Sequence, residues 1–77
     1  MPHVVVKLFA GSSEQRKSRL AAQLVKDLTA ILNWGEESIS VAIEEIKAGD
    51  WAEKVYNAEI APNWEELYKK PAYNLIE

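Results

Sequence analysis

The chain has no cysteine, only three glycines and three prolines, and no long hydrophobic run. Without cysteine it forms neither a disulfide nor a thiolate metal site. No apolar stretch approaches the roughly 18 residues that a membrane-spanning helix needs, which argues against a membrane partner. The sequence also begins without the charged and apolar regions of a signal peptide. Together with the absence of cysteine, this predicts a cytoplasmic protein.

Basic clusters are equally scarce. Twelve acidic and nine basic residues give a net charge of −3, and no basic run is longer than the two residues of Lys69-Lys70. Nucleic-acid binding depends on cations gathered on one surface, so this distribution argues against nucleic acid as a partner.

The size and composition instead predict self-association. A chain of 77 residues is expected to form one domain, spanning residues 1–77, and to bury roughly 60–65% of its unfolded surface. Hydrophobic residues nevertheless make up 48% of it, including three Trp and three Tyr. A small chain with so much apolar surface is expected to bury part of it against another copy, as a homo-oligomer.

Hydrophobic periodicity predicts a strand, a long helix and a second strand. The β-branched run 4–9 reads as a strand covered on both faces. Residues 10–13 interrupt it, and Ser12 with Gln15 matches the capping box that begins a helix. Asn33 and Gly35 are helix stop signals. The helix between them carries an apolar stripe, formed by Leu20, Leu24, Leu28, Ile31 and Leu32.

The second half begins with another strand. Residues 38–46 alternate between apolar and polar, and two strands joined by a long helix form a β-α-β unit whose strands run parallel. After a turn at 48–50, the pattern over 51–70 is helical, with a second short helix beginning at Pro62 and ending before Pro71. The tail 72–77 reads as a short edge strand or an extended segment. Such an α+β chain needs a second subunit to complete its sheet.

Pro2 is the first candidate for chemistry. Methionine aminopeptidases remove an initiator Met that precedes a small residue, and removal of Met1 would leave Pro2 as a free secondary amine at the start of a strand. An α-amino group titrates near pH ~8, and apolar surroundings lower that value. Such an amine is a good general base at neutral pH. The alternative is a passive strand start, where proline is tolerated because it lacks an amide donor.

Taken together, the motifs resemble the 4-oxalocrotonate tautomerase family, within the superfamily that also holds macrophage migration inhibitory factor. The C-terminal part is similar to the enterobacterial PptA branch in particular. The resemblance covers nearly the whole chain and rests on the order and spacing of its pieces. These are the opening Met1-Pro2-His3 with residues 4–7, the helix start 12–17, the strand 38–43, Trp51 after its turn, the segment 57–62, the run 69–71 and Tyr73.

The resemblance implies a macrophage migration inhibitory factor-like fold: parallel strands, a long crossover helix and short C-terminal helices, completed by pairing of subunits. It implies that Pro2 is the catalytic base of a keto–enol tautomerase, an intramolecular oxidoreductase in the isomerase class. The substrates would be 2-oxo acids of the phenylenolpyruvate or 2-hydroxydienoate type. That chemistry uses neither a metal nor an organic cofactor. In the PptA-like branch, the extra C-terminal residues favour a homodimer.

The chain departs from the family at the groups that bind the substrate carboxylate. The family's best-known enzyme uses two arginines. This chain has Gly11-Ser12 in the region of the first and Ser40 in place of the second. Ser40 and, more weakly, Ser38 are therefore the candidates for substrate hydrogen bonds. Trp51 stands where the family has an active-site Phe and is expected to line the pocket for an aromatic substrate.

Other interpretations stay open. His3 could act in acid–base chemistry, but adjacent strand residues point to opposite faces, so we expect it to face away from a pocket shared with Pro2. Ser40 could be an ordinary polar residue on a half-exposed strand, and Trp51 a core or interface anchor. Without the arginines, the chain could also be a non-catalytic oligomeric module that binds a small acid, or a structural dimer without a ligand.

Overall fold

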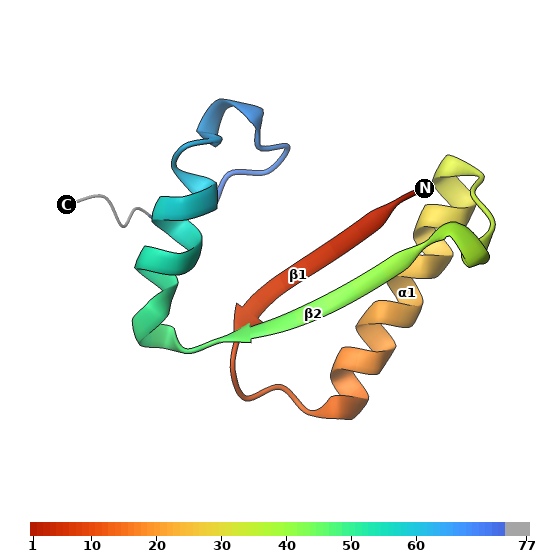
Figure 1. Ribbon diagram of the computed structural model, residues 1–77, viewed down its shortest axis with the longest axis horizontal. Coiled ribbons are helices and arrows are strands. Elements are labelled where there is room, and N and C mark those ends of the chain that lie inside the picture. Colours follow the sequence, from red (N-terminus) through yellow and green to blue (C-terminus); the bar gives the residue numbers. More distant parts are fainter. Residues whose placement is uncertain (74–77) are drawn as a thin grey trace. The chain divides into compact units, whose positions relative to one another are not determined.

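The computed structural model describes residues 1–73 of the chain, and Figure 1 shows its β-α-β order. Strand β1 spans His3–Phe9, helix α1 spans Glu14–Leu32, and strand β2 spans Ser40–Ile46. The described residues group into two compact units, a first unit Met1–Glu45 and a second unit that begins at Ile46.

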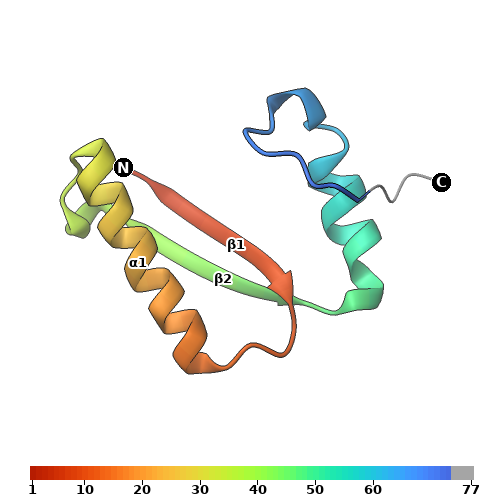
Figure 2. The ribbon, with the colours of Figure 1, turned by 180° about the vertical axis from the view of Figure 1, so that it is seen from behind.

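In the first unit, β1 and β2 pair in parallel and α1 connects them, which confirms the predicted β-α-β arrangement. Figure 2, seen from behind, shows α1 passing across one face of the two strands. Val41 and Ile43 of β2 line a hollow together with Lys17 and Ala21 of α1, so these strand residues face the helix. Because strand side chains alternate, the intervening residues lie on the opposite face.

That opposite face is open, contrary to the prediction of a first strand covered on both sides. Val5 is 43% exposed and Phe9 is 53% exposed, whereas Val4 and Val6 are half-buried. The continuous apolar run suggested two covered faces, but a single helix covers only one face of a two-stranded sheet.

The helix ends follow local hydrogen bonding. Ser13, not the predicted Ser12, is the N-cap of α1, because its hydroxyl accepts the Arg16 N–H at 3.2 Å. At the other end, Asn33 adopts the left-handed conformation (φ 61°) and its N–H donates to the Thr29 carbonyl. The predicted stop at Asn33 is thus confirmed. Ser38 lies in the short 3₁₀ helix η1 (Glu36–Ser38), so β2 begins two residues later than predicted.

Glu45 clasps the loop that joins β1 to α1. Its carboxylate accepts the Gly11 N–H at 3.0 Å and a hydrogen bond from the Lys17 ammonium at 3.2 Å. Gly11 has φ +121°, a backbone conformation that favours glycine. The clasp joins the end of β2, the β1–α1 loop and the first turn of α1.

The second unit contains three short helices, η2 (Ala48–Asp50), η3 (Ala52–Ile60) and η4 (Trp64–Glu66). Val55 and Tyr56 on η3 are the buried hydrophobic residues among those described. The two helices predicted within 51–70 are therefore both present, and the second is shorter than predicted. Pro62 lies in the turn before η4, and η4 ends well before Pro71. Residues 74–77 of the predicted edge strand lie outside the described part, and Ala72 and Tyr73 are not in a strand.

Helix η3 is a π-helix. Its widened turn shows at its end, where the Ala61 N–H donates to the Tyr56 carbonyl five residues back, at 2.8 Å. Among the helices that the structure describes, none has the length and apolar character needed to cross a membrane.

Candidate active site at the start of the first strand

Pro2 lies where the pairing of the two strands begins. Its carbonyl accepts the Ser40 N–H at 3.2 Å, which places it beside the first residue of β2. Met1 is 82% exposed and precedes the strand. The Pro2 carbonyl is thus held by the sheet, while its nitrogen carries the exposed Met1 as an amide.

Ser40 and His3 form a short polar contact across the two strands. The His3 Nδ1 atom lies 2.6 Å from the Ser40 hydroxyl oxygen, across the β1–β2 pair. Because the two side chains meet, they share one face of the sheet. Val41, the next residue after Ser40, faces α1, so the His3–Ser40 pair lies on the open face.

The Ser38 hydroxyl is engaged locally. It donates to the Gly35 carbonyl at 2.9 Å, and the Ser38 N–H donates to the same carbonyl at 3.1 Å. This pairing closes the turn η1 ahead of β2 and uses the one proton of the hydroxyl. The oxygen of Ser38 keeps lone pairs, so the residue can accept a hydrogen bond from a ligand but not donate one.

Trp51, in the second unit, belongs to an aromatic cluster with Tyr56 and Tyr73. Its indole N–H donates to the Tyr73 hydroxyl at 3.1 Å. The rings of Tyr56 and Tyr73 are tilted against each other with centroids 5.8 Å apart. Tyr56 is fully buried, whereas Trp51 is half-buried and Tyr73 is 42% exposed.

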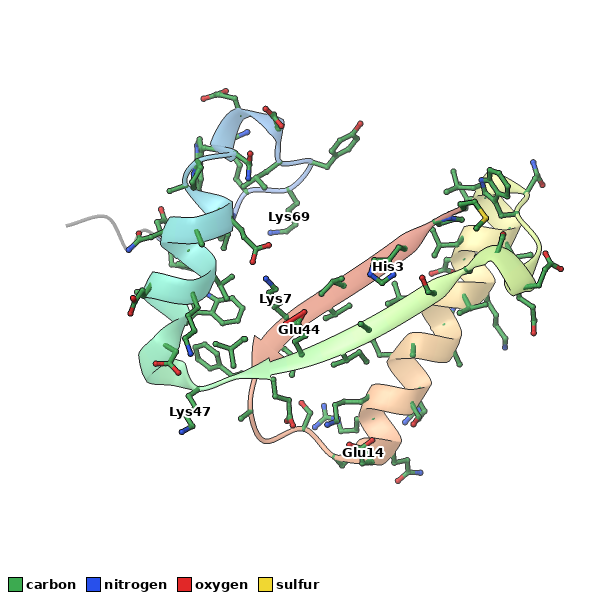
Figure 3. The ribbon with its side chains drawn as sticks, in the orientation of Figure 1. His3, Lys7, Glu14, Glu44, Lys47 and Lys69 are labelled. Atoms are coloured by element: carbon green, nitrogen blue, oxygen red, sulfur yellow. The ribbon has the colours of Figure 1, made fainter. Side chains whose placement is uncertain are left out.

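Charged side chains surround the candidate residues of the first unit. Lys7 lies four residues after His3 on β1, and Glu44 lies four residues after Ser40 on β2, so both share the open face (Figure 3). Arg16 and Lys17 line a separate hollow of about 300 Å³ together with Ser12, beside the β1–α1 loop. Both cations are thus close to the loop where the family's first arginine would fall.

The structure therefore brings Pro2, Ser40 and His3 together, with Ser38 two residues before Ser40, while Trp51 belongs to the second unit. The contact of His3 with Ser40 was not predicted. The alternation of strand side chains suggested that His3 points away from Pro2. However, the Pro2 atom that carries the predicted chemistry is a backbone nitrogen, and the alternation of side chains does not assign a backbone atom to either face. The signal for the contact was the placement of both residues at the starts of paired strands.

Comparison with known proteins agrees with this architecture. The family model described as "Tautomerase enzyme" matches residues 2–55. The chain is 36% identical over 76 residues to a probable tautomerase of Xylella fastidiosa, covering 99% of this chain and 93% of that protein. It is 40% identical over 76 residues to tautomerase PptA of Escherichia coli O139:H28, covering 97% of this chain and all of that protein.

Solved structures give the same fold. TomN, a 4-oxalocrotonate tautomerase homologue of the tomaymycin biosynthetic pathway, aligns with a TM-score of 0.63 at 28% identity, over 65% of this chain and 77% of TomN. Another 4-oxalocrotonate tautomerase homologue aligns with a TM-score of 0.64 at 24% identity, over 71% of this chain and 87% of its own, and supports the fold alone. The β-α-β fold places the chain in the class of 4-oxalocrotonate tautomerase-like proteins. The chain belongs to the tautomerase family, and among its relatives are the PptA tautomerases.

Proposed function

We propose that the protein is a cofactor-independent keto–enol tautomerase of 2-oxo acids, of the phenylenolpyruvate or 2-hydroxydienoate type, with the amine of Pro2 as its general base. The observation that carries the proposal is the position of Pro2: its carbonyl is held by Ser40, and its nitrogen bears only an exposed Met1. Removal of Met1 frees a secondary amine on a fixed backbone. The tautomerase names of relatives over nearly the full chain support the same reaction.

The proposed reaction moves one proton and one electron pair. The neutral Pro2 amine takes the proton from the enol hydroxyl, and the oxygen lone pair forms the carbonyl. The electrons of the carbon–carbon double bond then take a proton from the Pro2 ammonium, at the carbon next to the carbonyl. The amine returns to its neutral form, so nothing is oxidised or consumed. Only a base with a pKa near the working pH performs both transfers well.

The remaining candidate residues bind the substrate in this proposal. Ser40 hydrogen-bonds the carboxylate or carbonyl oxygen of the acid, and Ser38, whose hydroxyl proton is donated to the Gly35 carbonyl, is the weaker candidate for a substrate contact. Trp51 provides an aromatic surface for the phenyl ring of the substrate. The protein acts as a cytoplasmic homodimer, with small acids as its ligands. The open face of the sheet, on which Val5 and Phe9 are exposed, supports pairing of subunits.

The test is ketonisation of phenylenolpyruvate by purified protein whose loss of Met1 is confirmed by mass spectrometry. We expect turnover that rises with pH through an ionisation below pH ~8, the ordinary value for an α-amine. Pro2→Ala replaces the secondary amine by a primary one and should lower kcat/KM by about 100-fold. A form that retains Met1 carries an amide at Pro2 and should be inactive. Full activity of that form contradicts the mechanism.

A second candidate function rests on the missing arginines. Gly11-Ser12 and Ser40 stand where the family's carboxylate-binding residues fall, which favours a non-catalytic module that binds a small acid. This alternative predicts a melting temperature that rises with phenylpyruvate concentration, because the ligand binds only the folded state, while enol and keto forms interconvert no faster than in buffer. Turnover that depends on Pro2 excludes it.

A further inference from the structure

We propose that His3 is a positioning residue that sets the direction of the Ser40 hydroxyl, and that the pair becomes a carboxylate-binding group when the His3 imidazole is doubly protonated. This inference rests on the proposed function, because it assigns the anchor of the substrate carboxylate. It makes the His3–Ser40 pair the substitute for an arginine that this chain lacks.

The geometry places the pair beside the reactive nitrogen. His3 directly follows Pro2, and the Ser40 N–H is bonded to the Pro2 carbonyl at 3.2 Å. Across the strands, His3 Nδ1 lies 2.6 Å from the Ser40 hydroxyl oxygen, and both side chains are exposed. Ser40 is paired with Pro2 across the two strands. A carboxylate that contacts Ser40 on the open face is therefore separated from the amine of Pro2 only by the spacing of neighbouring strands.

The direction of the His3–Ser40 hydrogen bond depends on the proton of the imidazole. When Nδ1 is unprotonated, it accepts the hydroxyl proton, and Ser40 can offer a ligand only its lone pairs. When the ring is doubly protonated, Nδ1 donates to the Ser40 oxygen instead. The hydroxyl proton is then free to be donated to a carboxylate, and a doubly protonated ring adds a positive charge. An anion therefore binds better to the second state.

Linkage gives this preference a measurable consequence. A ligand that binds the protonated state more tightly must take up protons when it binds. Other ionisable groups on the surrounding elements are the Pro2 amine, Lys7 and Glu44, which lie four residues further along the same sheet face, and Glu36 and Glu37 on η1. The Pro2 amine also contributes proton uptake, so the part due to His3 must be isolated by substitution.

The experiment is calorimetric titration of the Met1-processed protein with 3-phenylpropionate, an unreactive aromatic carboxylate. Repeating it in buffers of different ionisation enthalpy gives the number of protons taken up. His3→Asn is the informative variant, because the amide nitrogen of Asn can take the place of Nδ1, donating to Ser40 without titrating. Lys26→Gln, on an exposed turn of α1, removes one positive charge elsewhere in the first unit and is the matched control.

We expect the wild type and Lys26→Gln to bind about 10-fold more tightly at about pH 6 than at about pH 8, the effect of one hydrogen bond to a charged group. His3→Asn should take up fewer protons than the wild type and show a weaker pH dependence of affinity, because only the contribution of the Pro2 amine remains. In a Ser40→Ala background, the change His3→Asn should have a smaller effect on affinity than in the wild type, because only the charge of the ring is then lost.

Three results overturn the inference: equal pH dependence in His3→Asn and the wild type, an undiminished effect of His3→Asn without the Ser40 hydroxyl, or no binding of 3-phenylpropionate to the wild type. A failure of the proposed function is distinct, since it appears as absent turnover of phenylenolpyruvate in the wild type. The calorimetric readout needs no turnover.

Discussion

Glu45 shows how a single residue joins three segments. The Gly11 N–H and then the Lys17 ammonium lower the pKa of the Glu45 carboxyl below its ordinary value of 4.5, because both favour the charged form. A lowered folded-state pKa stabilises the fold above the unfolded value. That stabilisation is lost as the pH falls from 4.5 through the folded value.

The first prediction concerns acid stability. Glu45→Gln should lower the urea midpoint more at about pH 7 than at about pH 3, because the stabilisation from the ionised wild-type carboxylate is lost as the pH falls below 4.5. Far-ultraviolet circular dichroism against urea at the two pH values measures this. Glu53→Gln, an exposed carboxyl in the second unit, is the control and should show no such difference. An equal loss for Glu45→Gln at both pH values would show that the clasp depends on shape rather than charge.

Lys17 should affect the pH dependence of folding stability at the alkaline end. Hydrogen bonds to Glu14 and then Glu45 raise its pKa above the ordinary 10.5. The associated stabilisation is complete below 10.5 and is lost as the pH rises through the folded value. Lys17→Met should therefore reduce the fall in the urea midpoint above pH 10.5. A fall as steep as that of the wild type would exclude Lys17 as its source.

At the scale of elements, the end of α1 depends on a backbone conformation. Asn33 has φ 61°, which glycine adopts freely and β-branched residues avoid. Asn33→Gly should change the free energy of unfolding by only a few tenths of a kcal/mol, whereas Asn33→Val should lower it by about 1–2 kcal/mol. Urea denaturation compares the two variants. Equal stabilities would mean that the helix end rearranges without cost.

The second unit depends on its buried tyrosine. Tyr56 is 1% exposed and contacts Tyr73, whereas Tyr68 is fully exposed. Tyr56→Ala should lower the free energy of unfolding by about 3 kcal/mol or more, because it opens a cavity. Tyr68→Ala should stay within about 0.5 kcal/mol. Thermal and urea unfolding of the pair measures the difference, and comparable losses would place Tyr68 in an interface.

The sequence predicts the strand–helix–strand order well and the details of its ends less well. Periodicity of 2 and 3.6 residues identifies β1, α1 and β2 because each runs for several turns or pleats. The capping-box pattern predicts Ser12 as the N-cap, but the neighbouring Ser13 has the same side chain, and its hydroxyl caps the helix. Apolar spacing over nine residues does not distinguish a π-helix from an α-helix. The sequence therefore predicts an ordinary helix where the structure has the π-helix η3.

The candidate site was predictable in its residues but not in its contacts. Pro2 and Ser40 emerged from the chain opening and the family resemblance, and the structure joins them through the Ser40 N–H. The His3–Ser40 contact depends on the register between strands that are more than thirty residues apart, which no local pattern encodes. The roles of Pro2, Ser38, Ser40 and Trp51 stay predictions for the experiments above, as does the single domain over 1–77.

At the scale of the whole molecule, exposed apolar side chains predict an assembly. If subunits pair through the open sheet face, Val5→Glu should shift the sedimentation coefficient to that of a monomer of 8.7 kDa, because it buries a charge in the interface. Ile31→Glu is the matched control, because Ile31 is 73% exposed and lies near the end of α1, outside the open sheet face. This substitution should leave the oligomer intact. Dissociation by Ile31→Glu alone would place the interface at the helix end.

The π-helix η3 has a consequence for how the chain tolerates insertions and deletions. A π-helix holds one more residue in each turn than an α-helix needs, so deleting one residue within Ala52–Ile60 allows that turn to tighten into ordinary α-helix. The deletion is absorbed where it occurs. In β2 the same deletion turns every later side chain to the other face of the sheet. Gene libraries with single-codon deletions should therefore retain folded members in η3 and lose them in β2.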